Sequence, residues 1–363
     1  MSPAGIIGSV PFTVESLSVE PLHVPLREPF VIASARVDTT RAALVSITLR
    51  EGDRVATGLG EAAPLWPVTR EDWPDLEPTL GGLGLVGSKL EDATSLPALG
   101  HSPVARAGLE TAVLDAIARL RGVPVAALLG PAPYVTTLET DITLPIAGAE
   151  HMTELARGWR ARGFRCFKVK VGKNLDDDVR ALRAVGAAIP DASFRLDANE
   201  GFSADEALGL LAAVDGLVIE CFEQPCDRED LDAMARVTRE SKTIVVADES
   251  VRTFADLERV LAHRAAGGVN LKLVKHGGLL SAYAIGRRAR EAGLAIMCGA
   301  MVETRLGLVA MAHVVAALRG AQFVDLDTAF LLGEERFEGG WTVNGPRIET
   351  NLAPGLDVRR AGR

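Results

Sequence analysis

Three acidic residues recur at nearly equal spacing through the second half of the chain. They are Asp197, Glu223 and Asp248, which lie 26 and then 25 positions apart, each at the end of a short apolar segment. Carboxylates brought together repel one another unless a cation lies between them. Oxygen ligands without histidine or cysteine suit a hard divalent ion, most often Mg²⁺. The sequence therefore predicts one Mg²⁺ per subunit on these three residues.

Lysines flank the three carboxylates along the chain. Lys168 and Lys170 lie in the preceding segment, FKVKV, and Lys272 lies in the following one, NLKLVK. Side chains alternate along a strand, so Lys168 and Lys170 should share one face. A lysine is usually a surface residue whose stem lies along apolar groups, but that reading fits poorly within apolar strands. We therefore expect these lysines to face the carboxylates.

This combination suits the removal of a proton from carbon. The proton next to a carboxylate is very weakly acidic, because its loss gives a doubly charged enediolate, which a divalent ion can stabilise. If Lys170 and Lys272 approach the substrate from opposite sides, one can remove the proton and the other can return it, which inverts the stereocentre. A base and an acid on one side would suit elimination instead.

The elements that must position these residues form a regular series. Short apolar segments rich in β-branched residues alternate with stretches that have helical spacing, such as 179–188, 204–213 and 281–291. The segments cover residues 137–145, 166–172, 193–199, 217–224, 243–249, 268–275, 295–301 and 322–327. Strands alternating with helices indicate a parallel sheet, and eight such units are the number that closes a barrel, with its active site at the carboxyl ends of the strands. An open doubly wound sheet is less favoured, because no glycine-rich phosphate loop follows the first strand.

The first part of the chain has a different pattern. Segments 13–24, 42–50 and 54–60 read as strands, and 103–121 has helical spacing that ends at Gly122. We therefore predict an α+β domain over residues 1–130, followed by the barrel over 131–334. The tail, 335–363, does not continue the barrel pattern, and we expect it to pack back on the first domain.

Composition limits the class of protein. The 363 residues are 48% hydrophobic and 24% charged, with a net charge of −9. An acidic chain lacks the basic surface that nucleic acid requires, and no apolar run reaches the length of a membrane span. Four cysteines without metal-site spacing, and no basic leader, favour a cytoplasmic protein. We expect neither a nucleic-acid partner nor a membrane partner.

Together these motifs resemble those of the enolase superfamily, in the muconate-lactonising-enzyme subgroup. The similar segments are Lys168-Val-Lys170, Asp197-Ala-Asn199, Glu223-Gln-Pro225, Asp248-Glu-Ser250, Lys272 with Lys275 and Gly277-Gly278, the stretch 25–30, and Gly58-Leu-Gly-Glu61. The resemblance extends over nearly the whole chain. It implies an α/β fold in which an N-terminal capping domain covers a modified TIM barrel, (β/α)₇β.

The same resemblance implies roles for individual residues. Lys170 and Lys272 would be the catalytic acid and base, and Lys168 would help to hold the substrate carboxylate. Asn199 and Glu249 would support the metal ligands. Members of the superfamily are commonly homo-oligomers, and we expect the same of this chain.

Asp325-Leu-Asp327, at the end of the eighth segment, bears on the substrate. Two carboxylates on one strand face suit an α-ammonium group, and subgroup members with this pair resemble dipeptide epimerases, in which it holds the free N-terminus. An N-acylated amino acid would leave both carboxylates buried without a partner. Glu303 nearby would add to their repulsion. We therefore expect a dipeptide epimerase acting on the C-terminal residue.

Three alternatives remain open at this point. An N-acylamino-acid racemase or o-succinylbenzoate synthase, a lyase, would use the same scaffold, which cannot distinguish among subgroup activities. A non-catalytic metal-binding barrel is disfavoured by the intact lysine pair.

The substrate's side chains should contact residues 31–40 and 65–69. Arg36 would favour an acidic side chain only weakly, and His276 is as easily a loop residue.

Overall fold

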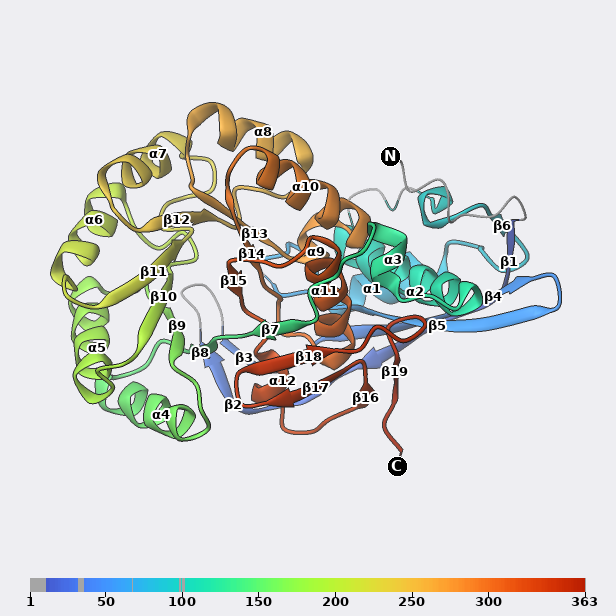
Figure 1. Ribbon diagram of the computed structural model, residues 1–363, viewed down its shortest axis with the longest axis horizontal. Coiled ribbons are helices and arrows are strands. Elements are labelled where there is room, and N and C mark those ends of the chain that lie inside the picture. Colours follow the sequence, from blue (N-terminus) through green and yellow to red (C-terminus); the bar gives the residue numbers. More distant parts are fainter. Residues whose placement is uncertain (1–10, 32–35, 67, 98, 100–101, 363) are drawn as a thin grey trace.

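The computed structural model of the chain describes residues 11–31, 36–66, 68–97, 99 and 102–362. Figure 1 shows two regions: a large parallel sheet with helices around its outside, and a smaller region built on antiparallel strands. The expected α/β architecture, a (β/α)₇β barrel with an N-terminal capping domain, is confirmed.

The parallel sheet contains eight strands in the order of the chain. They are β8 (Ile142–Leu144), β9 (Cys166–Lys170), β10 (Ser193–Asp197), β11 (Val218–Glu223), β12 (Ile244–Ala247), β13 (Gly268–Leu271), β14 (Ala295–Cys298) and β15 (Phe323–Val324). The intervening helices are α4 (Ala149–Ala161), α5 (Leu175–Ala188), α6 (Ala204–Ala213), α7 (Leu231–Glu240), α8 (Phe254–His263), α9 (Leu273–His276), α10 (Leu279–Glu291) and α11 (Arg305–Ala317). After the last strand comes α12 (Thr328–Leu331).

Strand register brings the charged residues of neighbouring strands side by side. Asp197 on β10 lies opposite Lys170 on β9 and opposite Glu223 on β11. The two outermost strands meet where the Asp141 backbone N–H donates to the Val324 carbonyl at 3.1 Å. The carboxyl ends of the strands therefore converge on one edge, as expected for a barrel.

The first predicted strand, 137–145, is wrong as a single element. Residues Thr137–Glu139 form β7, which pairs antiparallel with a strand of the C-terminal tail, and only β8 belongs to the barrel. Thr140 donates its backbone N–H to Pro346, whereas Asp141 donates to Val324. The chain changes its pairing partner between these two residues, which ends one strand and begins the next. The stretch 273–275, predicted as strand, instead lies in α9.

The capping region combines an antiparallel sheet with helices. Its sheet has the order β5 (Arg54–Ala62), β4 (Ala42–Glu51), β1 (Phe12–Leu22), β6 (Lys89–Leu90), and a separate hairpin joins β2 (Pro25–Val31) to β3 (Arg36–Thr39). The helices are α1 (Trp73–Gly81), the 3₁₀ turn η2 (Ala93–Ser95), α2 (Pro103–Arg121) and α3 (Val125–Leu129). The predicted helix 103–121 has these same bounds, with Ser102 capping its start and left-handed Gly122 (φ 67°) its end.

Two glycines allow strand β5 to lie directly on helix α2. A Cβ at Gly58 would overlap the Ala112 carbonyl oxygen, and a Cβ at Gly60 would overlap that of Gly108. Backbone therefore contacts backbone along this interface, which is why no larger residue fits at either position.

The C-terminal tail forms four short strands. These are β16 (Phe337–Gly339), β17 (Trp341–Asn344), β18 (Arg347–Thr350) and β19 (Val358–Arg360). Leu356 donates its N–H to Asp115 of α2 at 2.7 Å, and Val125 of α3 donates to Gly355 at 3.1 Å. The tail thus lies against the helices of the capping region, while β18 pairs with β7.

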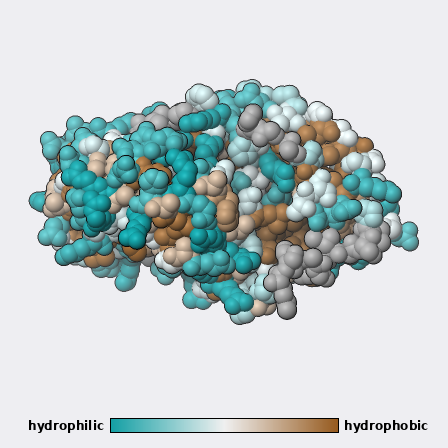
Figure 2. Space-filling view, turned by 90° about the horizontal axis from the view of Figure 1, so that it is seen from above, coloured by the Kyte–Doolittle hydropathy of each residue, from teal (hydrophilic) through white to brown (hydrophobic). Residues whose placement is uncertain are grey.

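The surface seen from above is mixed in character. In Figure 2 hydrophilic residues cover much of the left-hand side, and hydrophobic residues gather towards the middle and the right. Among the described helices, none combines the length and the apolar character needed to cross a lipid bilayer.

Replacement of Gly60 tests the contact between β5 and α2. We expect Gly60→Ala to lower the free energy of unfolding by about 3 kcal/mol, because the new methyl group meets rigid backbone. Urea unfolding followed by circular dichroism measures the change. Gly209→Ala is the control: this glycine is exposed inside α6 with open space around it, so alanine should stabilise by about 0.5–1 kcal/mol. Equal stability of the two variants would contradict the interpretation.

Candidate active site

A small cavity lies at the carboxyl ends of the barrel strands and is closed partly by the capping region. Its volume is about 40 Å³, which is room for only a few water molecules. Its charged and polar lining residues are Thr143, Lys168, Lys170, Asn199, Lys272, Asp325, Asp327 and Thr328, and its apolar ones are Leu65, Val68, Ala300, Met301 and Val302. Both predicted catalytic lysines therefore line the same cavity.

The two lysines of β9 point to the same side, as alternation predicts. Lys170 Nζ lies 2.6 Å from Asp197 Oδ2, and Lys168 Nζ lies 2.9 Å from the same oxygen. Lys168 also lies 2.6 Å from Glu223 and 2.7 Å from Asp325. This ammonium group therefore contacts two of the predicted metal ligands and one member of the Asp-x-Asp pair.

Asp197, Glu223 and Asp248 form a row, called the carboxylate row below, and Lys272 contacts the end of this row opposite Lys170. Lys272 directly follows β13, and its Nζ lies 2.6 Å from Asp248 Oδ2 and 3.7 Å from Glu223 Oε1. Asp197 and Asp248 are thus each paired with one of the predicted catalytic lysines, and Glu223 lies between them. All three carboxylates are at most 1% exposed.

Two further residues, Lys275 and Asn270, donate hydrogen bonds to the carboxylates Asp248 and Glu223. Lys275 donates to Asp248 Oδ1 at 2.6 Å, to the Asp248 carbonyl at 2.7 Å and to the Asn270 carbonyl at 2.8 Å. The Asn270 side-chain amide donates to Glu223 Oε1 at 2.7 Å. Asn270 lies inside β13 in the segment NLKLVK, and sequence reasoning missed it because its partner Glu223 lies on another strand.

The loops after the strands are fixed by their own polar residues. The side-chain amide oxygen Oε1 of Gln224 accepts the backbone N–H groups of Asp248 and Ser250, which ties the ends of β11 and β12 together. Asn199 has a left-handed backbone (φ 42°), which asparagine adopts more readily than most residues. Its side chain accepts from Lys170 at 3.1 Å and donates to Glu249 at 3.1 Å.

The pKa values of the buried carboxyl groups shift in two directions, depending on how close the lysines lie. Burial alone would raise the pKa of Asp197 and of Asp248, but the neighbouring ammonium groups outweigh it and lower both values. At Glu223, burial and the Asp197 charge prevail and raise the pKa to about 7. Burial, followed by the Asp248 charge, raises the pKa of Glu249 to about 8. Burial opposes the charge of Lys272, yet Asp248 and Glu223 raise its pKa on balance.

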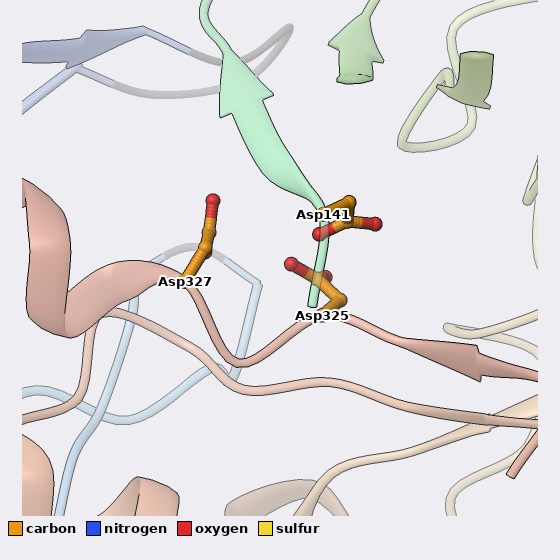
Figure 3. Close-up of side chains that lie close together, drawn as sticks. All are labelled: Asp141, Asp325 and Asp327. Carbon is orange, nitrogen blue, oxygen red and sulfur yellow. The ribbon is translucent and has the colours of Figure 1, made fainter. Parts of the chain in front are cut away.

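Asp325 and Asp327 follow β15 and lie beside a third carboxylate, Asp141, as Figure 3 shows. One oxygen of each lies within 4.8 Å of the others. Asp327 accepts the Thr143 backbone N–H at 2.6 Å, and burial, followed by the Asp325 charge, raises its pKa to about 7. Asp141 pairs with Arg195 at 2.9 Å, beneath the cavity lining. Sequence reasoning missed Asp141, which lies just before β8, because its partners Arg195, Asp325 and Asp327 are distant in sequence.

The structure describes only some of the residues expected to contact a substrate side chain. Leu65 and Val68 line the cavity, whereas residues 32–35 of the first loop lie outside the described part of the chain. Arg36 is exposed and pairs with Asp38 at 3.2 Å. His276 is buried, with Nδ1 2.9 Å from the Arg252 carbonyl, and burial lowers its pKa to about 3. Neither residue lines the cavity as described.

The carboxylate row has the chemistry of a divalent-cation site. Its donors are all oxygen, which suits Mg²⁺ better than a transition metal. Glu223 Oε2 is buried, and the Lys168 ammonium lies 2.6 Å from it. A buried carboxylate oxygen that already faces a positive charge can equally face a bound cation. Asp197, Glu223 and Asp248 therefore fit the ion that the sequence predicts.

Comparison with known proteins extends over nearly the whole chain. Residues 151–359 match the family described as enolase C-terminal domain-like, and residues 14–130 match the N-terminal domain of mandelate racemase and muconate lactonizing enzyme. An L-Ala-D/L-amino acid epimerase of Populus trichocarpa is 38% identical, over 90% of this chain and 79% of the relative.

Solved structures give the same result. The substrate-liganded L-Ala-D/L-Glu epimerase of Bacillus subtilis has a TM-score of 0.90 and 32% identity, covering 96% of this chain and 99% of its own. A dipeptide epimerase of Enterococcus faecalis V583, complexed with Mg and the dipeptide L-Leu-L-Tyr, has a TM-score of 0.84 and 27% identity, covering 95% and 99%.

Removal of Lys275 tests the support beneath Asp248. In EDTA, we expect Lys275→Met to lower the free energy of unfolding by about 3–5 kcal/mol, because it leaves buried acceptors without their donor. Urea unfolding gives the value. Lys242→Met removes an exposed lysine and should change stability by no more than about 0.5 kcal/mol. A loss at Lys275 as small as that of the control would show that the contacts with Asp248 contribute little.

Proposed function

The chain belongs to the enolase superfamily, and from this premise we propose that it is a Mg²⁺-dependent dipeptide epimerase. It would invert the α-carbon of the C-terminal residue by moving protons between two bases and the substrate. The observation that carries the proposal is the placement of Lys170 and Lys272. Each lies 2.6 Å from one of the outer carboxylates, Asp197 and Asp248, and both line one cavity.

The lysines divide the proton transfers between them. In one direction Lys170 Nζ takes the α-proton and Lys272 Nζ delivers a proton to the other face of the carbon; in the reverse direction the roles exchange. The carboxylates on either flank keep each ammonium close to the reacting carbon. β9 and β13 are separated by three strands, which supports an approach from two sides rather than one.

Asp197, Glu223 and Asp248 would hold one Mg²⁺, consistent with their oxygen donors and their burial. When bound, the ion would stabilise the negative charge that develops on the substrate carboxylate as the α-proton leaves. Lys168 would hold the same carboxylate. Its present contacts with Asp197, Glu223 and Asp325 show that its ammonium group reaches both ends of the cavity.

Asp325 and Asp327 favour a substrate with a free α-ammonium group. They supply acceptors that line the cavity, and Asp141 beside them is paired with Arg195. An N-acylated amino acid would bring no positive charge to this end, which weakens the case for an N-acylamino-acid racemase. The o-succinylbenzoate synthase reaction gives the Asp-x-Asp pair no partner either.

A dipeptide is larger than a cavity of about 40 Å³, so binding requires its walls to move. Leu65 and Val68 form the wall from the capping region, and a cavity of about 390 Å³ lies on the other side of Thr143. The preferred side chains of the dipeptide, the homo-oligomeric state and the cytoplasmic location stay predictions.

Deuterium incorporation tests this function. Metal-stripped protein is incubated in D₂O with a panel of L-Ala-L-X dipeptides, with and without Mg²⁺, and mass spectrometry locates deuterium. We expect exchange at the C-terminal α-carbon only with Mg²⁺, and none in N-succinyl amino acids. Exchange in the N-succinyl compounds alone, or product absorbance with the cyclohexadiene substrate of the synthase, would support those alternatives. No exchange with any dipeptide would reject the proposal.

Substitution of each lysine tests the two-base scheme. Lys170→Ala and Lys272→Ala should each slow epimerisation by about 10²–10⁴-fold, because one proton transfer loses its acid or base. In D₂O each variant should still exchange the α-proton of one epimer, and the two variants should differ in which one. Lys173→Ala, an exposed residue just beyond β9, serves as control and should retain activity. Loss of the same epimer's exchange in both variants would refute the scheme.

A further inference from the structure

Glu61 has no part in the reaction proposed above, yet it is a buried carboxylate that joins the two regions of the protein. It lies on β5 at the end of Gly58-Leu-Gly-Glu61 and is 3% exposed. The Thr304 backbone N–H donates to its two oxygens at 3.0 and 3.1 Å, the Thr304 hydroxyl donates at 2.6 Å and the Gly307 N–H at 3.1 Å.

These donors lie at the N-terminus of barrel helix α11, where Thr304 is the N-cap. The first N–H groups of a helix have no partner within it, and the helix dipole favours a negative charge there. A carboxylate from the capping region therefore completes the start of a barrel helix. All of its partners can donate to an ionised carboxylate, so the side chain is matched to this position.

Glu61 cannot shift easily relative to its own domain. Gly58 and Gly60, on the same strand, contact the backbone of α2 so closely that no side chain fits between them. From the other side, Gly108 of α2 leaves no space for a Cβ against Ala62. Because Glu61 is fixed on β5 and β5 on α2, its hydrogen bonds hold the start of α11 in place relative to both elements.

The segment that Glu61 holds forms one wall of the catalytic cavity. Ala300, Met301 and Val302 line that cavity just before Thr304. The Glu303 side chain accepts the Met301 N–H at 2.9 Å, and its carbonyl accepts the Thr328 hydroxyl at 2.9 Å. The C-terminal end of the wall is thus fixed twice, through Glu303 to Thr328, the residue after Asp327, and through Thr304 to Glu61.

We propose that Glu61 is a positioning residue through which the capping domain sets the wall Ala300–Val302 and thereby the affinity for substrate. This inference rests on the proposed function. It places Glu61 outside the chemistry, because the side chain contacts α11 and not the lysines or the carboxylate row. Its loss should therefore change KM and leave kcat nearly unchanged.

Glu61→Gln tests this with little change in volume. In the dipeptide assay we expect KM to rise about tenfold and kcat to stay within twofold of the wild type. Amide hydrogen exchange over residues 299–310 should accelerate at least tenfold.

Asp115→Asn is the matched control: Asp115 is a buried carboxylate that ties β5 and the tail to α2, but it does not touch the cavity wall. It leaves every contact of Glu61 in place, so both readouts should change by less than twofold. Thr304→Val removes the hydroxyl donor to Glu61 and also the hydroxyl oxygen that accepts the Leu306 N–H, and it keeps the two backbone donors. It provides a second variant should Glu61→Gln fail to fold, with changes in the same direction.

The outcomes separate the two proposals. A wild-type protein inactive on every dipeptide refutes the proposed function, and hydrogen exchange then still reports whether Glu61 holds α11. With an active wild type, unchanged KM or unchanged exchange in Glu61→Gln overturns the positioning role. A fall in kcat at constant KM also overturns it, because it would place Glu61 in the chemistry.

Discussion

The pairing of buried ammonium groups with buried carboxylates is the interaction on which the site depends. Removing an ion from water costs several kcal/mol unless an opposite charge and hydrogen bonds replace the water. Strand register meets this requirement, since Asp197 lies between Lys170 and Glu223 on adjacent strands. Lys168 and Lys272 extend the alternation of charge across the edge of the sheet. The barrel thus concentrates charges that would be unstable if any one of them stood alone.

A second constraint lies between the capping region and the barrel. The active-site cavity has walls from both, so its shape depends on how firmly they are joined. The join uses backbone contact at Gly58 and Gly60 and a carboxylate at Glu61, all within four residues of β5. Rigid contacts of this kind fix β5, and the loop carrying Leu65 and Val68 follows directly after this strand.

Much of the fold could be predicted from sequence, because local patterns determined it. The helix 103–121 has its own cap residues, and the regular series of strands indicates the barrel. What could not be predicted depends on partners distant in sequence. Residues 137–145 read as one strand, but their partners, Pro346 and Val324, lie far along the chain. Asn270 and Asp141 were missed for the same reason: their roles come from neighbours on other strands.

Charge balance connects these features to the choice of substrate. At neutral pH a dipeptide carries one carboxylate and one ammonium group, so it adds no net charge to a buried site. Lys168 already contacts both the carboxylate row and Asp325. A dipeptide could replace those contacts at both ends, offering its carboxylate to the lysine and its ammonium to Asp325 and Asp327. An N-acylated amino acid would add only negative charge, and the Asp-x-Asp end would gain nothing. The buried charges therefore favour a zwitterion through the same pairing of opposite charges that stabilises the lysines and carboxylates of the site.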